Sequence, residues 1–254
     1  MNNIQTLETI LHLESLMPQT NTNTLVLFDV GDVLLIPENA LLQSKVKAVR
    51  ERLRAEYLAP LGQEQHKHLW SQVLVKEKRQ LVEPHTPQVI KNLQQKGAKV
   101  MALSALQTGK LGAIESMEDW RLAHLGAHGI HFSPVAQDQE YFVLDELLQD
   151  GFSPVYKKGA LFTYKHPKGQ ALTAFLKRIT WKPQHITFVD DKREMVEDVA
   201  AVADALKVPF SGFHYVAAHA LRKPLDEMLT ERQFKHLVEH GQWLTEDEAR
   251  ATLG

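Results

Sequence analysis

The chain has 254 residues, which is enough for one large domain or for a core domain with an insertion, and its 44% hydrophobic and 24% charged residues are typical of a soluble globular protein. A net charge of −2 gives no basic excess for nucleic acid, and the absence of cysteine excludes disulfides, thiol catalysis and thiolate metal sites. With no apolar run long enough for a membrane span and no standard secretory signal, we expect a cytoplasmic protein without membrane partners, signal-independent secretion being the alternative.

Strand and helix patterns alternate along most of the chain. In the first half they predict a helix over 4–16, a strand over 25–29, helices over 39–81, a helix over 86–96 and a strand over 100–103. In the second half they predict a helix over 113–126, a strand over 129–132, a hairpin over 152–164, a helix from 167, a strand over 185–189, a helix over 192–206 and a strand from 208.

The last forty residues are predicted to be helical. Two capping boxes support this prediction, one from Thr230 to Gln233 and one from Thr245 to Glu248. Because the preceding strands alternate with helices, the fold class is predicted to be α/β with a parallel sheet.

Three polar side chains fall where predicted strands end. Asp29 closes the strand Leu25–Phe28, Ser104 follows the strand over 100–103, and Asp190 follows the strand over 185–189. In an open parallel sheet, ligands bind at the carboxyl ends of the strands, near the point where the strand order reverses. We therefore expect these three residues to lie at one edge of the sheet and to form a site.

Asp29 is the candidate nucleophile. A carboxylate can attack phosphorus to give an aspartyl-phosphate, which divides one difficult displacement into two easier steps. We expect Gly31 to relax the backbone just after this residue. A solvated or capping aspartate at a strand end is the alternative.

Lys168 lies at the predicted start of a helix, where the helix dipole disfavours a cation. A lysine in that place often has an anionic partner, such as a phosphate group or the nucleophilic aspartate. Lys165 is a weaker candidate for the same role, and an exposed surface lysine is the alternative for both. Ser104 can donate its hydroxyl to a phosphate oxygen, or it can be a plain turn serine.

Asp190, Asp191 and Glu194 form a second acidic group. Magnesium keeps several waters and takes one or two protein carboxylates together with substrate phosphate. We expect Asp29 and Asp190 to bind Mg²⁺, and either Asp191 or Glu194 to hold a metal-bound water or to orient Lys168. One of the adjacent aspartates can instead cap the following helix.

In this order, the motifs resemble those of the haloacid dehalogenase superfamily over roughly residues 24–210. The likeness rests on Asp-Val-Gly-Asp-Val-Leu from Asp29, on the strand that leads into Ser104, on the Lys168-Gly169 helix start and on the strand that leads into Asp190-Asp191. It is greatest to an uncharacterised bacterial branch with the Lys-Gly helix start and the Phe-Val-Asp-Asp strand.

The resemblance implies a three-layer Rossmann-like parallel-sheet core with a small helical cap insertion. We expect the core to comprise residues 1–35 and 98–215, the cap residues 36–97, and a C-terminal helical extension residues 216–254. A cap of this kind excludes water and selects the substrate. The segment 133–164, with its hairpin, is a second candidate lid.

The resemblance also implies a magnesium-dependent phosphatase that acts on a small phosphorylated substrate. Asp29 would be its nucleophile, Ser104 its phosphate-binding hydroxyl and Lys168 its charge-neutralising lysine. The metal ligands implied in this way are Asp29, the backbone carbonyl of Gly31, Asp190, and Asp191 or Glu194.

One departure from the family pattern affects the expected activity. Phosphatases of the superfamily usually carry a second aspartate two residues after the nucleophile, which protonates the leaving oxygen, and here that position is Gly31. Asp32 cannot simply replace it, because neighbouring residues on an extended segment point in opposite directions. General acid–base help is worth about 10²–10⁴ in rate, so we expect a slow phosphatase, or one restricted to good leaving groups.

Two other functions compete with this hypothesis. The first is a catalytically inactive binding or regulatory protein on the same fold, which Gly31 favours and for which the helical tail would be a partner surface. The second is dehalogenase chemistry on the same nucleophile, which the second acidic group disfavours because dehalogenases need no metal. The sequence names no protein partner.

Overall fold

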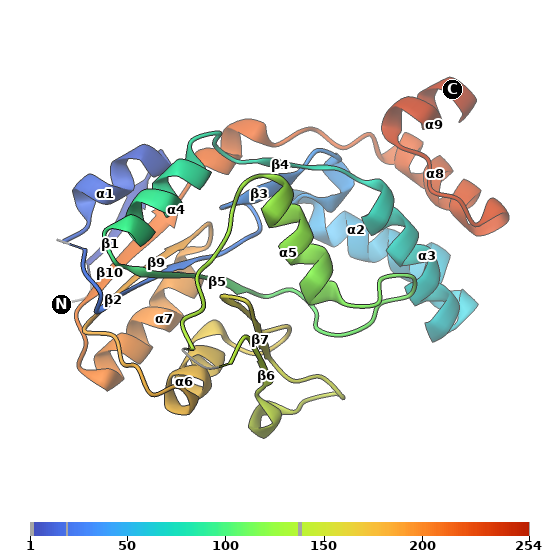
Figure 1. Ribbon diagram of the computed structural model, residues 1–254. Helices are drawn as coiled ribbons and strands as arrows, with labels where there is room; N and C mark the ends of the chain where they lie inside the picture. Colours follow the sequence, from blue (N-terminus) through green and yellow to red (C-terminus); the bar gives the residue numbers. More distant parts are fainter. Residues whose placement is uncertain (1–2, 19, 137–138, 254) are drawn as a thin grey trace.

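A central eight-stranded sheet organises the computed structural model, which describes residues 3–18, 20–136 and 139–253 (Figure 1). Its strands are β1 (Asn3–Leu7), β2 (Thr24–Phe28), β5 (Lys99–Ser104), β6 (Tyr141–Val143), β7 (Val155–Lys157), β8 (Ala160–Phe162), β9 (His185–Asp190) and β10 (Phe210–Tyr215). They lie in the order β1-β10-β9-β2-β5-β8-β7-β6.

The strands from β1 to β8 in this order are parallel, and β7 pairs antiparallel with both β8 and β6, so β7 runs against the other described strands of this sheet. Strand β2 lies at its centre and is buried along its whole length. After β2 the chain forms β5, β6, β7 and β8 on one side of β2, and then forms β9 and β10 on the other side. The strand order therefore reverses between β2 and β9, which is the place where ligands bind in such sheets.

Helices cover both faces of the sheet. Val26 and Phe28 of β2 pack toward α1 (Leu13–Leu16), α4 (Thr86–Gln95) and α5 (Met117–Ala127). Leu25 and Leu27 point to the opposite face, toward α6 (Lys168–Arg178) and α7 (Arg193–Leu206). Because alternate residues of one strand serve two apolar layers, both sides of β2 are hydrophobic. The three-layer α/β fold predicted from the sequence is confirmed.

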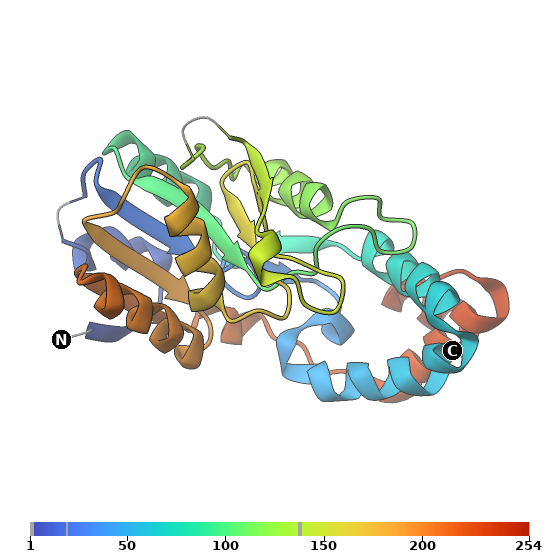
Figure 2. The same ribbon diagram turned by 90° about the horizontal axis from the view of Figure 1, so that it is seen from below.

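A separate group of helices lies beyond the carboxyl ends of the parallel strands (Figures 1 and 2). It contains α2 (Lys47–Leu53), a π-helical turn (Arg54–Leu58) and α3 (Gln63–Lys76), all inserted between β3 (Leu35–Pro37) and β4 (Arg79–Leu81). Strands β3 and β4 pair antiparallel outside the main sheet and form the base of the insertion. Short 3₁₀ helices lie at Ile10–His12, Ala40–Leu42, Ser44–Val46, Ala59–Leu61, Asp145–Leu147 and Ala217–Leu221.

The C-terminal helices α8 (Glu227–His240) and α9 (Glu246–Leu253) belong to this second group. The ring of Phe234 lies 5.7 Å from that of Tyr57 and 5.6 Å from that of Trp243, within a hydrophobic cluster that also contains Trp70. The predicted extension at 216–254 therefore packs against the insertion.

The predicted cap, residues 36–97, contains two kinds of structure. Helices α2 and α3 lie in the outer group, whereas Val89, Ile90 and Leu93 of α4 pack on the sheet. The predicted hairpin at 152–164 is confirmed as β7 and β8, and because β8 pairs with β5, these strands extend the main sheet. The division into core, cap and extension stays a prediction.

Several local predictions are wrong. Residues 3–7 form strand β1 and not part of a helix, because Ile4 and Leu7 pack toward opposite faces of the sheet and do not share one helix face. Residues 129–132 form no strand, and β4 interrupts the helical pattern predicted over 39–81. The predicted capping box from Thr230 to Gln233 lies inside α8 and does not cap it. The N-cap of α8 is Asp226, whose side chain accepts a hydrogen bond from the backbone N–H of Leu229.

The second capping box is confirmed, since Thr245 and Glu248 each accept a hydrogen bond from the backbone N–H of the other. The longest helices, α3, α7 and α8, have 14 residues each. Across the described ranges, no helix combines the length and the apolar character that a membrane span requires.

Candidate active site

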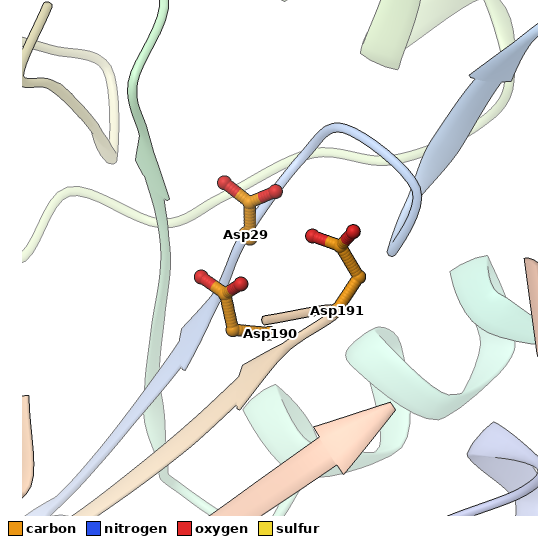
Figure 3. A group of neighbouring side chains, drawn as sticks. All are labelled: Asp29, Asp190 and Asp191. Atoms are coloured by element: carbon orange, nitrogen blue, oxygen red, sulfur yellow. The ribbon is translucent and has the colours of Figure 1, made fainter. Parts of the chain in front are cut away.

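Asp29, Asp190 and Asp191 converge at the carboxyl edge of the sheet (Figure 3). Asp29 directly follows β2, and its backbone N–H donates to the carbonyl of Val189 at 2.9 Å, which holds the two strand ends side by side. Each of the three aspartates offers one carboxylate oxygen within 4.8 Å of those of the other two. We call these three residues the carboxylate cluster.

Lys168 joins two members of the cluster. Its Nζ donates to Asp29 Oδ1 at 2.5 Å and to Asp190 Oδ2 at 2.6 Å. Lys168 is the first residue of α6, so the predicted anionic partners of a lysine at a helix start are these two carboxylates. Burial alone would lower the pKa of Lys168, but the attraction of Asp29 and Asp190 outweighs burial and raises this pKa.

One ammonium does not balance three carboxylates. Burial, together with repulsion from Asp29, raises the pKa of Asp190 to about 6. Burial, with repulsion from Asp29 and Asp190, raises the pKa of Asp191 to about 7. When all three carboxylates are ionised, two negative charges in the cluster are uncompensated, and such charges are costly to bury.

The cluster fits a hard divalent cation. Such ions take oxygen ligands, and Mg²⁺ in particular takes a small number of carboxylates. A single divalent cation would balance the two uncompensated charges, and Asp29, Asp190 and Asp191 would hold it. Gly31 lines the same cavity as these three residues.

The structure distinguishes among the remaining predicted site residues. Asp191 lies in the cluster, whereas Glu194 is exposed on α7 and does not line the cavity. Lys165 is exposed and pairs with Asp150 at 3.2 Å, so it does not share the role of Lys168. Ser104 is buried at the end of β5 and lines the cavity, as expected.

The loop after the candidate nucleophile differs in one detail from the prediction. The left-handed backbone conformation lies at Asp32 (φ 58°) and not at Gly31. This turn directs the Asp32 carboxylate to the hydroxyl of Ser44 and to Arg222 Nη2, the latter at 3.6 Å from Oδ2. These two partners engage the Asp32 carboxylate.

A cavity of about 450 Å³ opens over the cluster, between the edge of the sheet and the insertion. Its wall includes four arginines that sequence reasoning missed: Arg50, Arg54, Arg79 and Arg121. Arginine at single positions of a helical pattern is normally exposed, so no local signal marks these residues. Their position depends on the pairing of β3 with β4 and on the packing of α5.

Comparison with known proteins gives two matches and one negative result. The family model described as "Protein of unknown function (DUF2608)" matches residues 5–250. An uncharacterized protein of Rickettsia prowazekii (strain Madrid E), RP296, is 24% identical over 241 residues, which cover 95% of this chain and 87% of the relative. No solved structure matches the chain.

These findings correct the family predicted from the sequence. The assignment to the haloacid dehalogenase superfamily is wrong, because the family model that matches nearly the whole chain is a different one. Four short motifs in a given order resemble the superfamily, but they cover few residues, whereas the family model extends over the insertion and the C-terminal helices as well. The chain belongs to the family described as "Protein of unknown function (DUF2608)".

Proposed function

We propose that the protein is a magnesium-dependent phosphatase that hydrolyses phosphate monoesters through an aspartyl-phosphate on Asp29. The observation that carries this proposal is the buried arrangement in which Lys168 Nζ lies 2.5 Å from Asp29 Oδ1 and 2.6 Å from Asp190 Oδ2. A carboxylate fixed by an ammonium at the mouth of a cavity suits nucleophilic attack on an anionic substrate. The proposal rests on this geometry and not on family membership.

Asp29 is oriented for attack by its hydrogen bond to Lys168. This bond occupies Oδ1, and no hydrogen bond from the described part of the chain occupies Oδ2, which remains available to attack phosphorus. Attack forms the Asp29–phosphorus bond and breaks the bond from phosphorus to the ester oxygen, which leaves with the bonding electrons. Water then cleaves the aspartyl-phosphate, which releases inorganic phosphate and restores Asp29.

Lys168 and Ser104 stabilise the transferred group. The ammonium of Lys168 lies beside the attacking carboxylate and reduces its repulsion of the phosphoryl oxygens. Ser104, at the end of the neighbouring strand β5, can donate its hydroxyl to one of these oxygens. A magnesium ion bound at the carboxylate cluster would supply further charge neutralisation for the phosphoryl group.

Gly31 limits the range of substrates. An acid that protonates the leaving oxygen typically contributes about 10²–10⁴ in rate, and neither Gly31, which has no side chain, nor Asp32, which is engaged by Ser44 and Arg222, supplies it. Aryl, anomeric and acyl phosphates have leaving groups that need little protonation. We therefore expect turnover of aryl phosphates to exceed that of alkyl phosphates of similar size.

A panel of aryl and alkyl phosphates, assayed with and without Mg²⁺, tests the proposal. Turnover should require the metal, and Asp29→Asn should reduce it by roughly 10⁴-fold or more because the nucleophile is lost. Asp145→Asn, at an exposed acid outside the cavity, is the control and should leave the rate unchanged.

Two results would contradict the phosphatase. Magnesium binding without turnover of any ester would instead support a binding or regulatory protein. Equal turnover by Asp29→Asn and the wild-type protein would exclude the aspartyl-phosphate.

A further inference from the structure

The four arginines of the cavity differ in their partners. Arg54 Nη1 lies 3.1 Å from Glu51 Oε2, and Arg50 Nε lies 3.6 Å from Glu51 Oε1, so both charges have a carboxylate beside them. Arg79 and Arg121 form no ion pair with any carboxylate in the residues that the structure describes. We call Arg79 and Arg121 the arginine pair.

The arginine pair shares one aromatic platform. The guanidinium carbon of Arg79 lies 4.4 Å from the ring centre of Trp120, and that of Arg121 lies 5.2 Å from the same centre. Strand β4 supplies Arg79, and helix α5 supplies both Trp120 and Arg121. Two like charges are therefore held near each other by elements that are distant in the sequence.

The arginine pair has few hydrogen bonds. Arg79 is only 8% exposed, and among the described residues its side chain forms one hydrogen bond, a long one of 3.5 Å from Nη1 to the carbonyl of Glu77. The Nε of Arg121 is buried and has no hydrogen-bond partner in the part of the chain that the structure describes. Guanidinium groups carry five N–H donors each, so most of the donors of this pair remain available to a ligand.

Glu77, two residues before Arg79, makes its hydrogen bonds with other side chains. Glu77 accepts hydrogen bonds from Asn39 at 2.7 Å and from the indole of Trp243 at 2.6 Å, both on Oε1. Burial raises the pKa of Glu77. Burial also lowers the pKa of Arg79 to about 9 and that of Arg121 to about 10, so both guanidiniums remain charged at neutral pH.

We propose that Arg79 and Arg121 form a second anion-binding subsite, and that the substrate is a small phosphate monoester that carries another negatively charged group, a carboxylate or a second phosphate. Buried charges without a partner are costly, and a bound anion removes that cost. Guanidinium groups bind both kinds of anion through paired N–H···O bonds. This inference rests on the proposed function for the location of the reacting phosphoryl group at Asp29.

The cavity places the subsite within reach of the reacting end. Arg79 and Arg121 line the same space of about 450 Å³ as Asp29 and Lys168, and the charge of Asp29 acts on Arg121. A space of this size suits a small-molecule ligand. One molecule can therefore contact both the candidate nucleophile and the arginine pair.

Calorimetry with phosphonates tests the subsite without any need for turnover. The probes are propylphosphonate, with one anionic group, and 3-phosphonopropionate and 1,3-propanebisphosphonate, with two, together with their two- and four-carbon homologues. Comparison of 3-phosphonopropionate with 1,3-propanebisphosphonate shows whether the second anionic group is a carboxylate or a phosphate. Magnesium is kept in the same excess throughout, so that chelation by the probe is equal for every variant.

In the wild-type protein, at least one probe with two anionic groups should bind roughly tenfold or more tightly than the matched monophosphonate. The double variant Arg79→Gln/Arg121→Gln should reduce this gain to within about twofold. Arg178→Gln is the matched control, because Arg178 also lies over an aromatic ring, that of Phe142 at 5.1 Å, but does not line the cavity. It should retain the full gain.

Three results would overturn the subsite: no gain in the wild-type protein, no binding of any probe, or a gain that persists in the double variant. A fourth would be an equal loss of propylphosphonate and bisphosphonate affinity in the double variant, since the arginines would then hold the reacting group itself. The ester panel gives an independent result. Turnover without an affinity gain from a second anion would support the phosphatase and exclude the subsite. An arginine-dependent affinity gain without turnover would support the subsite and exclude the phosphatase.

Discussion

The carboxylate cluster and the arginine pair lie in one cavity, and each gathers buried charges of one sign. The cluster contains part of its own counter-charge, because Lys168 bonds to two of its three members. The arginine pair contains none. This difference indicates that the cluster is partly prepared in the free protein, whereas the arginine pair depends on a ligand for its counter-charge.

The largest expected contrast lies in the stability of the metal-free and phosphate-free protein. Lys168→Met leaves Asp29 and Asp190 without their cation and should lower the free energy of unfolding by roughly 3–5 kcal/mol. Arg121→Met removes a buried charge that forms no direct ion pair within the described residues, and it should raise this free energy by roughly 1–2 kcal/mol. Urea unfolding in a chloride buffer measures both.

Lys165→Met is the control for the lysine, because its ion pair with Asp150 is exposed. It should change stability by less than about 0.5 kcal/mol. The contrast fails if Arg121→Met destabilises the protein as much as Lys168→Met does, since Arg121 would then have a partner within the chain.

Magnesium should produce the next largest effect, and on the carboxylate cluster alone. At about one hundred times its dissociation constant, Mg²⁺ should stabilise the wild-type protein by roughly 2.7 kcal/mol. Asp191→Asn should abolish this gain, because Asp191 lies in the cluster, and Glu194→Gln should preserve it, because Glu194 is exposed and outside the cavity. Thermal melts with and without the metal measure the difference.

Calcium, which also takes oxygen ligands, is a second titrant for the same variants. A loss of the magnesium effect in Glu194→Gln with its retention in Asp191→Asn would reverse the assignment of the second acid.

The smallest expected effect reports on the arginine pair through His124. Burial lowers the pKa of His124 to about 4, and repulsion from Arg79, Arg121 and His128 contributes to this shift. A hydrogen bond between His124 Nδ1 and the carbonyl of Trp120, at 2.7 Å, acts in the opposite direction and raises the pKa. The unfolded chain therefore takes up a proton first as the pH falls, and the contribution of His124 to stability is lost between about pH 6.5 and pH 4. A bound bisphosphonate should raise this pKa toward its ordinary value, since it neutralises the nearby guanidiniums.

An NMR titration of the His124 ring, with and without 1,3-propanebisphosphonate, measures this shift. Arg79→Gln should raise the same pKa in the absence of ligand. His185, whose pKa burial alone lowers, lies outside the cavity and should not respond. An unchanged His124 pKa in the presence of saturating bisphosphonate would show that the anion binds elsewhere.

The carboxylate cluster was predictable because its signals are local. A hydrophobic run that ends in aspartate marks both Asp29 and Asp190, and a lysine at a helix start marks Lys168. The order of the strands then brings β2, β5 and β9 together, as expected for a parallel sheet. The choice of Asp191 over Glu194 was not predictable, because it depends on where α7 begins relative to β9.

The arginine pair was not predictable for a different reason. Arg79 lies in a short strand that falls inside a helical sequence pattern, and β3, its partner strand, is more than forty residues away along the chain. Similar long-range pairing explains β1, whose apolar spacing is compatible with a helix until β10 is beside it. Periodicity describes one element, whereas the cavity wall depends on contacts between elements.

The packing of α8 against the insertion has a consequence for the movement of ligands. Tyr57 and Trp243 enclose Phe234, and Arg52 of α2 bonds to Glu227 at 3.0 Å. The insertion, which forms one wall of the cavity, is thus held in place at two points: by the β3–β4 ribbon at its base and by its contacts with the C-terminal helices. A hinge motion of the insertion about the β3–β4 ribbon would have to move α8 and α9 as well, or separate the aromatic rings. Exchange of small molecules without movement of the insertion is therefore favoured.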